Sequence, residues 1–172
     1  MGANAMAVPN GSIFMTDQMF ALFEHEENQP GGKLSTAGEY QLASVLAHEI
    51  GHIELRHSIQ NIAASSMVTT LIASLIGDYS TMLTVASGTL LHAQYSQEKE
   101  AEADEYAIGL LKANKISPAY AAQLFEVLEK HAKERKQGNN QFSWLTGQME
   151  DYFSSHPSNQ KRIARFKQAA QE

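Results

Sequence analysis

The sequence contains no cysteine, and this absence excludes disulfide bonds, thiolate metal sites and cysteine nucleophiles. Any bound metal ion must therefore be held by histidine, aspartate or glutamate. Proline is also rare, with four residues in 172, and 43% of the residues are hydrophobic, so the composition is that of a folded chain rather than a disordered one. A chain of this length predicts a single domain, residues 1–172.

The chain also lacks a long basic run and a long apolar run. Its 13 Lys and Arg residues against 19 Asp and Glu residues give a net charge of −6, so nucleic acid is not expected as a partner. No apolar stretch reaches the ~20 residues that cross a bilayer. Residues 1–4 have neither the basic nor the apolar part of a signal peptide, so we expect either a cytosolic protein or a chain that begins after its signal.

A β-hairpin is predicted near the N-terminus, because two short apolar runs, residues 5–8 and 12–15, flank Pro9-Asn10-Gly11. The later start signals favour helices. They are found at Thr36, which forms a capping box with Glu39, at Ser96, at Ser117-Pro118 and at Pro157. The first helix should run to about Gln60 or beyond, the third to about Lys136 and the last to the end of the chain. The predicted fold is therefore mainly α with a small N-terminal β element (α+β).

Two apolar segments, residues 62–76 and 82–91, follow the start of the first helix and are separated by Gly77-Asp78. Each is too short to span a bilayer. A buried helical hairpin is the favoured interpretation. A surface that contacts a membrane or binds a partner is the alternative.

The strongest chemical signal is His48-Glu49-Ile50-Gly51-His52, which has the H-E-x-x-H pattern. Because the motif lies inside a predicted helix, its two histidines share one face about one turn apart and can bind one ion. The flanking residues are small or apolar, which predicts that this turn is buried. A buried histidine pair needs a partner, and Zn²⁺ is the usual one. Two surface histidines that have this spacing by chance are the alternative.

A catalytic zinc ion usually has three protein ligands and a water, so one more ligand is expected. Glu100 and Asp104 are candidates, because they are one turn apart and share an inward face with small and aliphatic residues. Glu98 and Glu102 lie about 200° around the helix from Glu100, on the expected solvated face. An acidic helix N-terminus that complements the helix dipole is the alternative. Glu49 is excluded as a ligand, because it lies about 80° from the midline of the two histidines.

With these segments in place, the sequence resembles the M48 family of zinc metallopeptidases, which includes the CAAX-prenyl endopeptidase and the HtpX-like and BepA-like bacterial proteases. The matching residues, in the order of the family, are Asn4-Ala5 with Pro9-Asn10-Gly11, the H-E-x-x-H motif with Arg56-His57, Tyr95-Ser96 with residues 100–104, and His156-Pro157 with Arg162-Ile163. The resemblance implies a gluzincin-type metallopeptidase domain built on the H-E-x-x-H helix. It also implies a longer N-terminal part with a targeting signal, and a place in the bacterial periplasm or cell envelope.

By this resemblance, His48, His52 and Glu100 are the ligands of one Zn²⁺ ion and Glu49 is the general base. Glu49 would accept a proton from a zinc-activated water, which attacks the peptide bond of a protein or peptide substrate. Asp104, one turn beyond Glu100, is expected to accept the outer N–H of a ligand histidine.

His156 precedes a proline, so its backbone should be extended and its ring is free to reach into a cleft. With the resemblance, two roles are open: a donor to the oxyanion, or a fourth zinc ligand that keeps the resting enzyme latent, which we favour. Arg162 would orient His156 or the substrate. His57 lies about 180° around the helix from His48, so it should face away from the ion as a structural or exposed residue. The remaining histidines, His25, His92 and His131, have no motif around them.

Two functions are compatible with these features. The first is a zinc endopeptidase that binds extended substrates along the hairpin edge, with Asn4 bonded to the substrate backbone. An ordinary strand-end asparagine is an equal alternative for Asn4, and unfolded or membrane-associated proteins are candidate substrates. The second is a chaperone-like or quality-control protein that binds clients, or a membrane, through residues 62–91 with little proteolysis. Glu49 favours the first, because a protein that only binds needs no base there.

Overall fold

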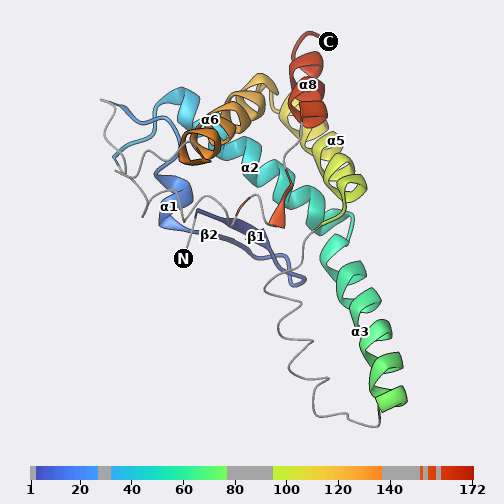
Figure 1. The fold of residues 1–172 in the computed structure, drawn as a ribbon. Helices are drawn as coiled ribbons and strands as arrows, with labels where there is room; N and C mark the ends of the chain where they lie inside the picture. The colour runs from blue at the N-terminus through green and yellow to red at the C-terminus, as the bar shows by residue number, and fades with distance from the viewer. Residues whose placement is uncertain (1–2, 27–31, 77–94, 137–151, 153–154, 158–159) are drawn as a thin grey trace.

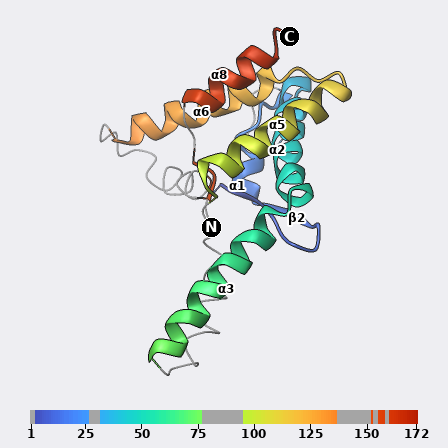
Figure 2. The ribbon, with the colours of Figure 1, turned by 90° about the vertical axis from the view of Figure 1, so that its right-hand side faces the viewer.

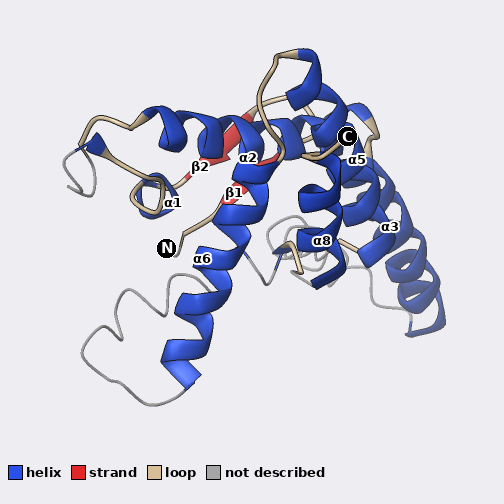
Figure 3. Ribbon diagram, turned by 90° about the horizontal axis from the view of Figure 1, so that it is seen from above, coloured by secondary structure: helices blue, strands red, loops and turns tan. Residues whose placement is uncertain are grey.

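The computed structural model describes residues 3–26, 32–76, 95–136, 152, 155–157 and 160–172. In chain order its elements are β1 (Ala5–Ala7), β2 (Ile13–Met15), α1 (Asp17–Phe20), α2 (Thr36–Glu54), α3 (His57–Ile76), α5 (Gln97–Ala113), α6 (Ala119–Lys136) and α8 (Gln160–Ala169). Helices make up most of the described chain, and the two strands form one small sheet (Figures 1 and 3). The prediction of a mainly α fold with an N-terminal β element is confirmed.

Strands β1 and β2 form the predicted hairpin. They pair antiparallel, with Ala5 opposite Met15 and Ala7 opposite Ile13. Gly11 in the connection has a φ of 87°, a left-handed conformation that glycine adopts without a steric penalty. The side chains of Ala5 and Ala7 are buried, and β1 packs against α2.

Helix α2 begins at Thr36 as predicted, but its cap differs from the prediction. Ser35 is the N-cap: its backbone is extended and its hydroxyl accepts the N–H of Gly38. The predicted capping box of Thr36 with Glu39 is therefore wrong by one residue. Serine and threonine are both good caps, so two adjacent candidates cannot be separated by residue type alone.

The first helix is shorter than predicted. Helix α2 ends at Glu54, and α3 begins at His57 in a new direction (Figure 1). Between them Arg56 has a φ of 57°, a left-handed conformation outside the α-helical range. The expectation of one helix to Gln60 or beyond is wrong, because apolar spacing continues through the break and does not reveal it.

Helix α3 projects away from the other helices (Figures 1 and 2). His57 at its start is buried, but the described side chains from Ser58 onward are half-buried or exposed, and Met67 is 75% exposed. The predicted burial of residues 62–76 is thus wrong for the side chains that are described, and residues 82–91 lie outside the described part. Among the described helices, none has the length and apolar character needed to cross a membrane.

Helices α5, α6 and α8 complete the core around α2. Helix α5 follows the predicted cap, Ser96, whose hydroxyl accepts the N–H of Lys99. Helix α6 ends at Lys136, as predicted, and α8 begins after Pro157. The largest fully buried apolar side chains are Met19, Leu111, Leu128 and Phe166, which come from α1, α5, α6 and α8. Burial of such side chains is the main stabilising contribution to the fold.

Helices α2 and α5 approach most closely at Gly51. A Cβ atom at this position would lie 3.0 Å from the carbonyl oxygen of Ala103 and 3.1 Å from its Cα. The two backbones can therefore pack together only because α2 has no side chain here and α5 has a small one. This contact sets the distance between the histidines of α2 and the carboxylates of α5.

We expect Gly51→Val to lower the free energy of unfolding by about 1–3 kcal/mol, because the added methyl groups must push α5 away. Gly109→Val is the matched control: Gly109 is likewise a glycine within a helix, α5, but an added Cβ there would meet no atom within 4 Å. Urea denaturation of both variants, with a metal chelator present, measures the change in the free energy of unfolding at each position. Equal effects at the two positions would contradict the close-packing interpretation.

Candidate metal centre

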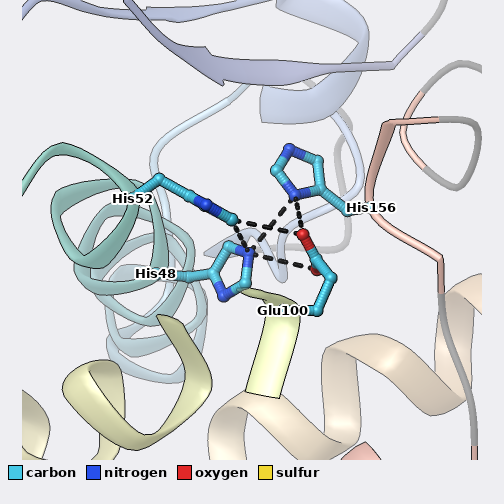
Figure 4. Close-up of side chains that lie close together, drawn as sticks. All are labelled: His48, His52, Glu100 and His156. Atoms are coloured by element: carbon cyan, nitrogen blue, oxygen red, sulfur yellow. Dashed lines mark hydrogen bonds and ion pairs between the residues drawn. The ribbon is translucent and has the colours of Figure 1, made fainter. Parts of the chain in front are cut away.

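Four side chains from three parts of the chain converge on one point (Figure 4). His48 and His52 come from α2, Glu100 comes from the first turn of α5, and His156 comes from the segment before α8. All four are buried, and each offers a ligand atom within 4.8 Å of the others. Among the described residues this is the group of side chains suited to hold a metal ion.

The local structure explains why these side chains meet. His48 and His52 are one turn apart on α2, so their rings lie on the same face, with centroids 4.6 Å apart. Glu100 lies on the face of α5 that packs on this turn. His156 lies outside the regular helices, and its backbone N–H donates to the carbonyl of Tyr152 at 2.8 Å. This is the spacing of a helical turn, and His156, the residue before Pro157, carries its ring into the cluster as expected.

The distances between the ligand atoms fit a single metal ion. Nε2 of His48 lies 3.0 Å from Nε2 of His52 and 3.3 Å from Nδ1 of His156. Oε1 of Glu100 lies 3.2 Å from Nε2 of His52 and 3.1 Å from Nδ1 of His156. Four tetrahedral ligands at the usual metal distances of 2.0–2.2 Å are separated by about 3.3–3.6 Å. Three imidazole nitrogens and a carboxylate that face each other this closely could hold one metal ion.

The electrostatics of the cluster favour a cation. Burial lowers the pKa of His52 to about 3, so its ring is neutral, which is the form that binds metals. Burial also opposes the charged form of His48, but Asp104 and Glu100 outweigh it and raise its pKa to about 9. Burial disfavours ionised Glu100 as well, yet hydrogen bonds with His156 and the two α2 histidines hold its pKa well below the usual range. The carboxylate therefore remains charged among the imidazoles.

Glu49 is fully buried beside this cluster. Its Oε2 accepts the backbone N–H of Ala7, in β1, at 2.8 Å. Its Oε1 lies 3.4 Å from Nε2 of His156 and accepts no hydrogen bond from the described residues. Burial raises the pKa of Glu49, so this carboxylate takes up a proton more readily than an exposed one. A buried acceptor without a donor is suited to take one from a bound molecule.

Asp104 and Arg162 form a buried ion pair behind the cluster. The Nε and terminal nitrogen of Arg162 donate to the two carboxylate oxygens of Asp104 at 2.6 and 2.8 Å. Oδ1 of Asp104 lies 2.9 Å from Nδ1 of His48, the outer nitrogen of that ring. A second terminal nitrogen of Arg162 lies 2.6 Å from Glu100 and donates to the carbonyl of Pro157 at 3.0 Å. Arg162 thus contacts both acidic residues of α5 and the segment that carries His156.

His57 is a buried structural residue outside the metal cluster, as one predicted alternative has it, but the prediction that it faces away from the site is wrong. Its ring is buried, and its Nδ1 lies 2.9 Å from Nδ1 of His52. Its Nε2 lies 3.0 Å from Oε2 of Glu102, which was expected to be solvated and whose side chain is 55% exposed. The left-handed Arg56 turns the chain after α2, so the position of His57 around a continuous helix does not apply.

No role was predicted for two aromatic residues near the cluster, although Tyr95 stands in a segment that carries the family resemblance. The ring of Tyr95 stacks on His52 with centroids 4.0 Å apart, and Tyr152 stacks on His156 at 4.9 Å. The hydroxyl of Tyr95 lies 2.7 Å from Oγ of Ser58. Neither tyrosine has metal-ligand spacing to any motif, and only the folded chain brings them to the histidines.

Of the remaining residues named from the sequence, Asn4 and His25 lie outside the metal cluster, and the others are not among the described side chains. Asn4 pairs through its backbone with Thr16 in the hairpin, and its side-chain oxygen lies 3.5 Å from the hydroxyl of Ser155. His25 is buried near Phe20 and is not a member of the metal cluster. His92 lies outside the described residues, as does the side chain of His131.

Comparison with known proteins finds relatives that are named as metalloproteases. The chain is 28% identical to the metalloprotease YcaL of Escherichia coli over 179 residues and 30% identical to the metalloprotease LoiP of the same organism over 166 residues. It is 28% identical over 171 residues to the mitochondrial metalloendopeptidase OMA1 of Schizosaccharomyces pombe. These matches cover 94%, 92% and 96% of this chain, but only 63%, 55% and 43% of the respective relatives.

No solved structure matches the chain significantly. Residues 1–170, however, match the family model described as peptidase family M48. Since this match spans nearly the whole chain, and since the buried cluster of His48, His52, Glu100 and His156 supplies the metal site that such a family requires, the chain belongs to peptidase family M48.

Proposed function

We propose that this protein is a zinc-dependent endopeptidase. The observation that carries the proposal is the buried set of His48, His52 and Glu100 with Glu49 beside it. Two imidazoles and one carboxylate are a ligand set typical of catalytic zinc, and an adjacent buried carboxylate is typical of a general base. Relatives named as metalloproteases and as a metalloendopeptidase support this activity.

Zinc fits the cluster better than other common metal ions. Magnesium and calcium prefer oxygen ligands and higher coordination numbers, whereas this cluster is rich in imidazole. Zn²⁺ is commonly held by histidine nitrogens together with a carboxylate oxygen, which is the ligand set present here. His48, His52 and Glu100 would hold the ion.

Glu49 would act as the general base. A bound Zn²⁺ supplies Lewis-acid chemistry, because it acidifies water and polarises a carbonyl. Oε1 of Glu49 would accept the proton of the attacking water and pass it to the amine that leaves. The N–H of Ala7 holds Oε2, which leaves Oε1 free for this transfer.

An extended protein or peptide substrate would bind along the edge of β1 that faces away from β2. At Ala7 this edge already bonds to Glu49 and to the hydroxyl of Ser58, so a substrate would have to pair beside these contacts or replace them. The N–H of Ala7 points away from β2, since it donates to Glu49. Alternate residues of a strand direct their backbone groups to the same edge, so those of Ala5 share this orientation. A peptide paired with this edge would pass beside the base. The backbone of Asn4 is bonded to Thr16, so Asn4 would contact a substrate through its side chain.

His156 would act as a displaceable fourth ligand in the resting protein. Its Nδ1 is 3.3 Å from Nε2 of His48 and 3.1 Å from Glu100, which is the spacing of ligands around one ion. A ring in that place occupies the position that water takes in a three-ligand site. The segment that carries it would have to move before a substrate could react.

For the metal itself, we expect about one equivalent of zinc per chain. Glu100→Ala removes the carboxylate of the cluster. Loss of a residue that only contacts a ligand usually lowers metal affinity by about 10–100-fold, so loss of the ligand itself should lower zinc affinity by more than about 100-fold. Glu98→Ala is the matched control, because it removes the same charge from an exposed position of the same helix turn. Competition with a chromogenic chelator measures both. Full zinc affinity in Glu100→Ala would overturn the ligand assignment.

For the base, Glu49→Gln should retain zinc and the fold but lose about 10²–10⁴-fold in kcat, because an amide cannot take the proton. The measurement is cleavage of unfolded casein by the zinc-loaded proteins, with zinc content determined on the same samples. A kcat close to that of the wild type would exclude Glu49 as the base. Casein binding without cleavage by the wild type would instead favour a client-binding protein.

For the latch, His156→Ala should raise the rate of casein cleavage while zinc affinity falls, because a ligand is removed and its place opens to water. The two readouts separate the two roles of His156. A loss of about 10²–10³-fold in kcat with unchanged zinc affinity would show that His156 is an oxyanion donor and would refute the latch. Unchanged kinetics and affinity would remove His156 from the site.

A further inference from the structure

A chain of three polar side chains leads from the metal cluster to the surface. Nε2 of His52 faces the cluster, and its other nitrogen, Nδ1, lies 2.9 Å from Nδ1 of His57. Nε2 of His57 lies 3.0 Å from Oε2 of Glu102. Both histidines are fully buried, whereas the Glu102 side chain is 55% exposed. The catalytic proposal above uses neither His57 nor Glu102.

The direction of the hydrogen bonds in this chain follows from the partners at its outer end. An ionised carboxylate only accepts hydrogen bonds, so Nε2 of His57 must donate to Glu102. In neutral His57 the other nitrogen, Nδ1, then has no proton and must accept one from Nδ1 of His52. That leaves Nε2 of His52 without a proton, with its lone pair directed into the cluster. A doubly protonated His57 is incompatible with this form of His52, because two N–H groups would face each other at 2.9 Å.

We propose that His57 and Glu102 are positioning residues that hold His52 in the tautomer able to bind zinc. The proposal rests on the zinc site described above and extends it beyond the ligands. Without the hydrogen bonds to His57 and Glu102, the proton of His52 would move to Nε2, because Oε1 of Glu100 lies 3.2 Å from this nitrogen and can accept a hydrogen bond. Zinc would then have to displace this proton in order to bind Nε2. A partner that favours the Nδ1–H form removes this penalty and raises the zinc affinity.

The fold builds this contact at the break between α2 and α3. The left-handed Arg56 ends α2 and gives the chain a new direction, so that His57, five residues after His52, lies against the outer nitrogen of that ring. Glu102 comes from α5, which also supplies Glu100 to the cluster. One ligand histidine, His48, thus has Asp104 directly behind it, and the other has Glu102 behind it through His57.

Zinc affinity, measured by chelator competition at fixed pH, tests the proposal. His57→Leu fills the space without an acceptor, and the affinity should fall by about 10–100-fold. His57→Asn keeps an oxygen close to the place of Nδ1, so its affinity should return to within a few-fold of the wild type. Full affinity in His57→Leu, or an equal loss in the Asn variant, would overturn the proposal.

Glu102→Ala should lower the affinity less than His57→Leu does, because water can reach its exposed position. Glu98→Ala, an exposed carboxylate on the same helix, is the matched control for charge. Since Glu102 acts through His57, the double variant His57→Leu/Glu102→Ala should bind zinc as His57→Leu does. Identical effects of Glu102→Ala and Glu98→Ala, or additive losses in the double variant, would refute this coupling. Because Glu102 is exposed, Glu102→Ala should fold, and it tests the proposal even if His57→Leu fails to fold.

Nitrogen-15 NMR of the imidazoles in the zinc-loaded wild type gives a readout that packing alone would not produce. We expect His57 to be neutral, with a proton on Nε2 and none on Nδ1. A proton on Nδ1 of His57 would contradict the proposed direction. Absence of zinc binding by the wild type would defeat the proposed function itself, whereas normal binding with unaffected variants would defeat only this inference.

Discussion

The site depends on the close contact between α2 and α5 at Gly51 and Ala103. With a side chain at position 51, the helices could not approach to the present distance, and an added Cβ would already lie 3.0 Å from the backbone of α5. The ligand atoms of His48 and His52 reach Glu100 at 3.2–3.4 Å because of this approach. A small shift between the helices would therefore move ligands on both sides of the cluster.

Burial of charge is the second constraint on this region. Glu49, Glu100 and Asp104 are all buried, and an unpaired buried carboxylate is strongly unfavourable. Arg162, itself buried, contacts two of them and compensates part of their charge. Removing one partner of such a group leaves an uncompensated charge, so the acids, the arginine and the histidines are stable only together. A bound cation adds to this balance at the point where the imidazoles meet.

The hairpin and the break after α2 extend the site in two directions. Strand β1 donates the N–H of Ala7 to Glu49, so the strand edge proposed to bind substrate contacts the proposed base. The break at Arg56 places His57 behind a ligand histidine and connects it to Glu102. Ala7 and Glu49 are far apart in sequence, as are His57 and Glu102, and each hydrogen bond ties a side chain of this region to another segment of the chain.

Local patterns in the sequence were enough to predict the hairpin, the cap of α5, the helix that carries H-E-x-x-H and the inward face shared by Glu100 and Asp104, because each depends on spacing within one element. The tertiary structure alone decided the rest. A single left-handed residue, Arg56, invalidates the continuous helical wheel used for His57. The described side chains of α3 after His57 are half-buried or exposed despite the apolar composition of the segment. The contacts of Tyr95, Arg162 and Glu102 join separate segments, and periodicity within a segment carries no information about which other segment it meets.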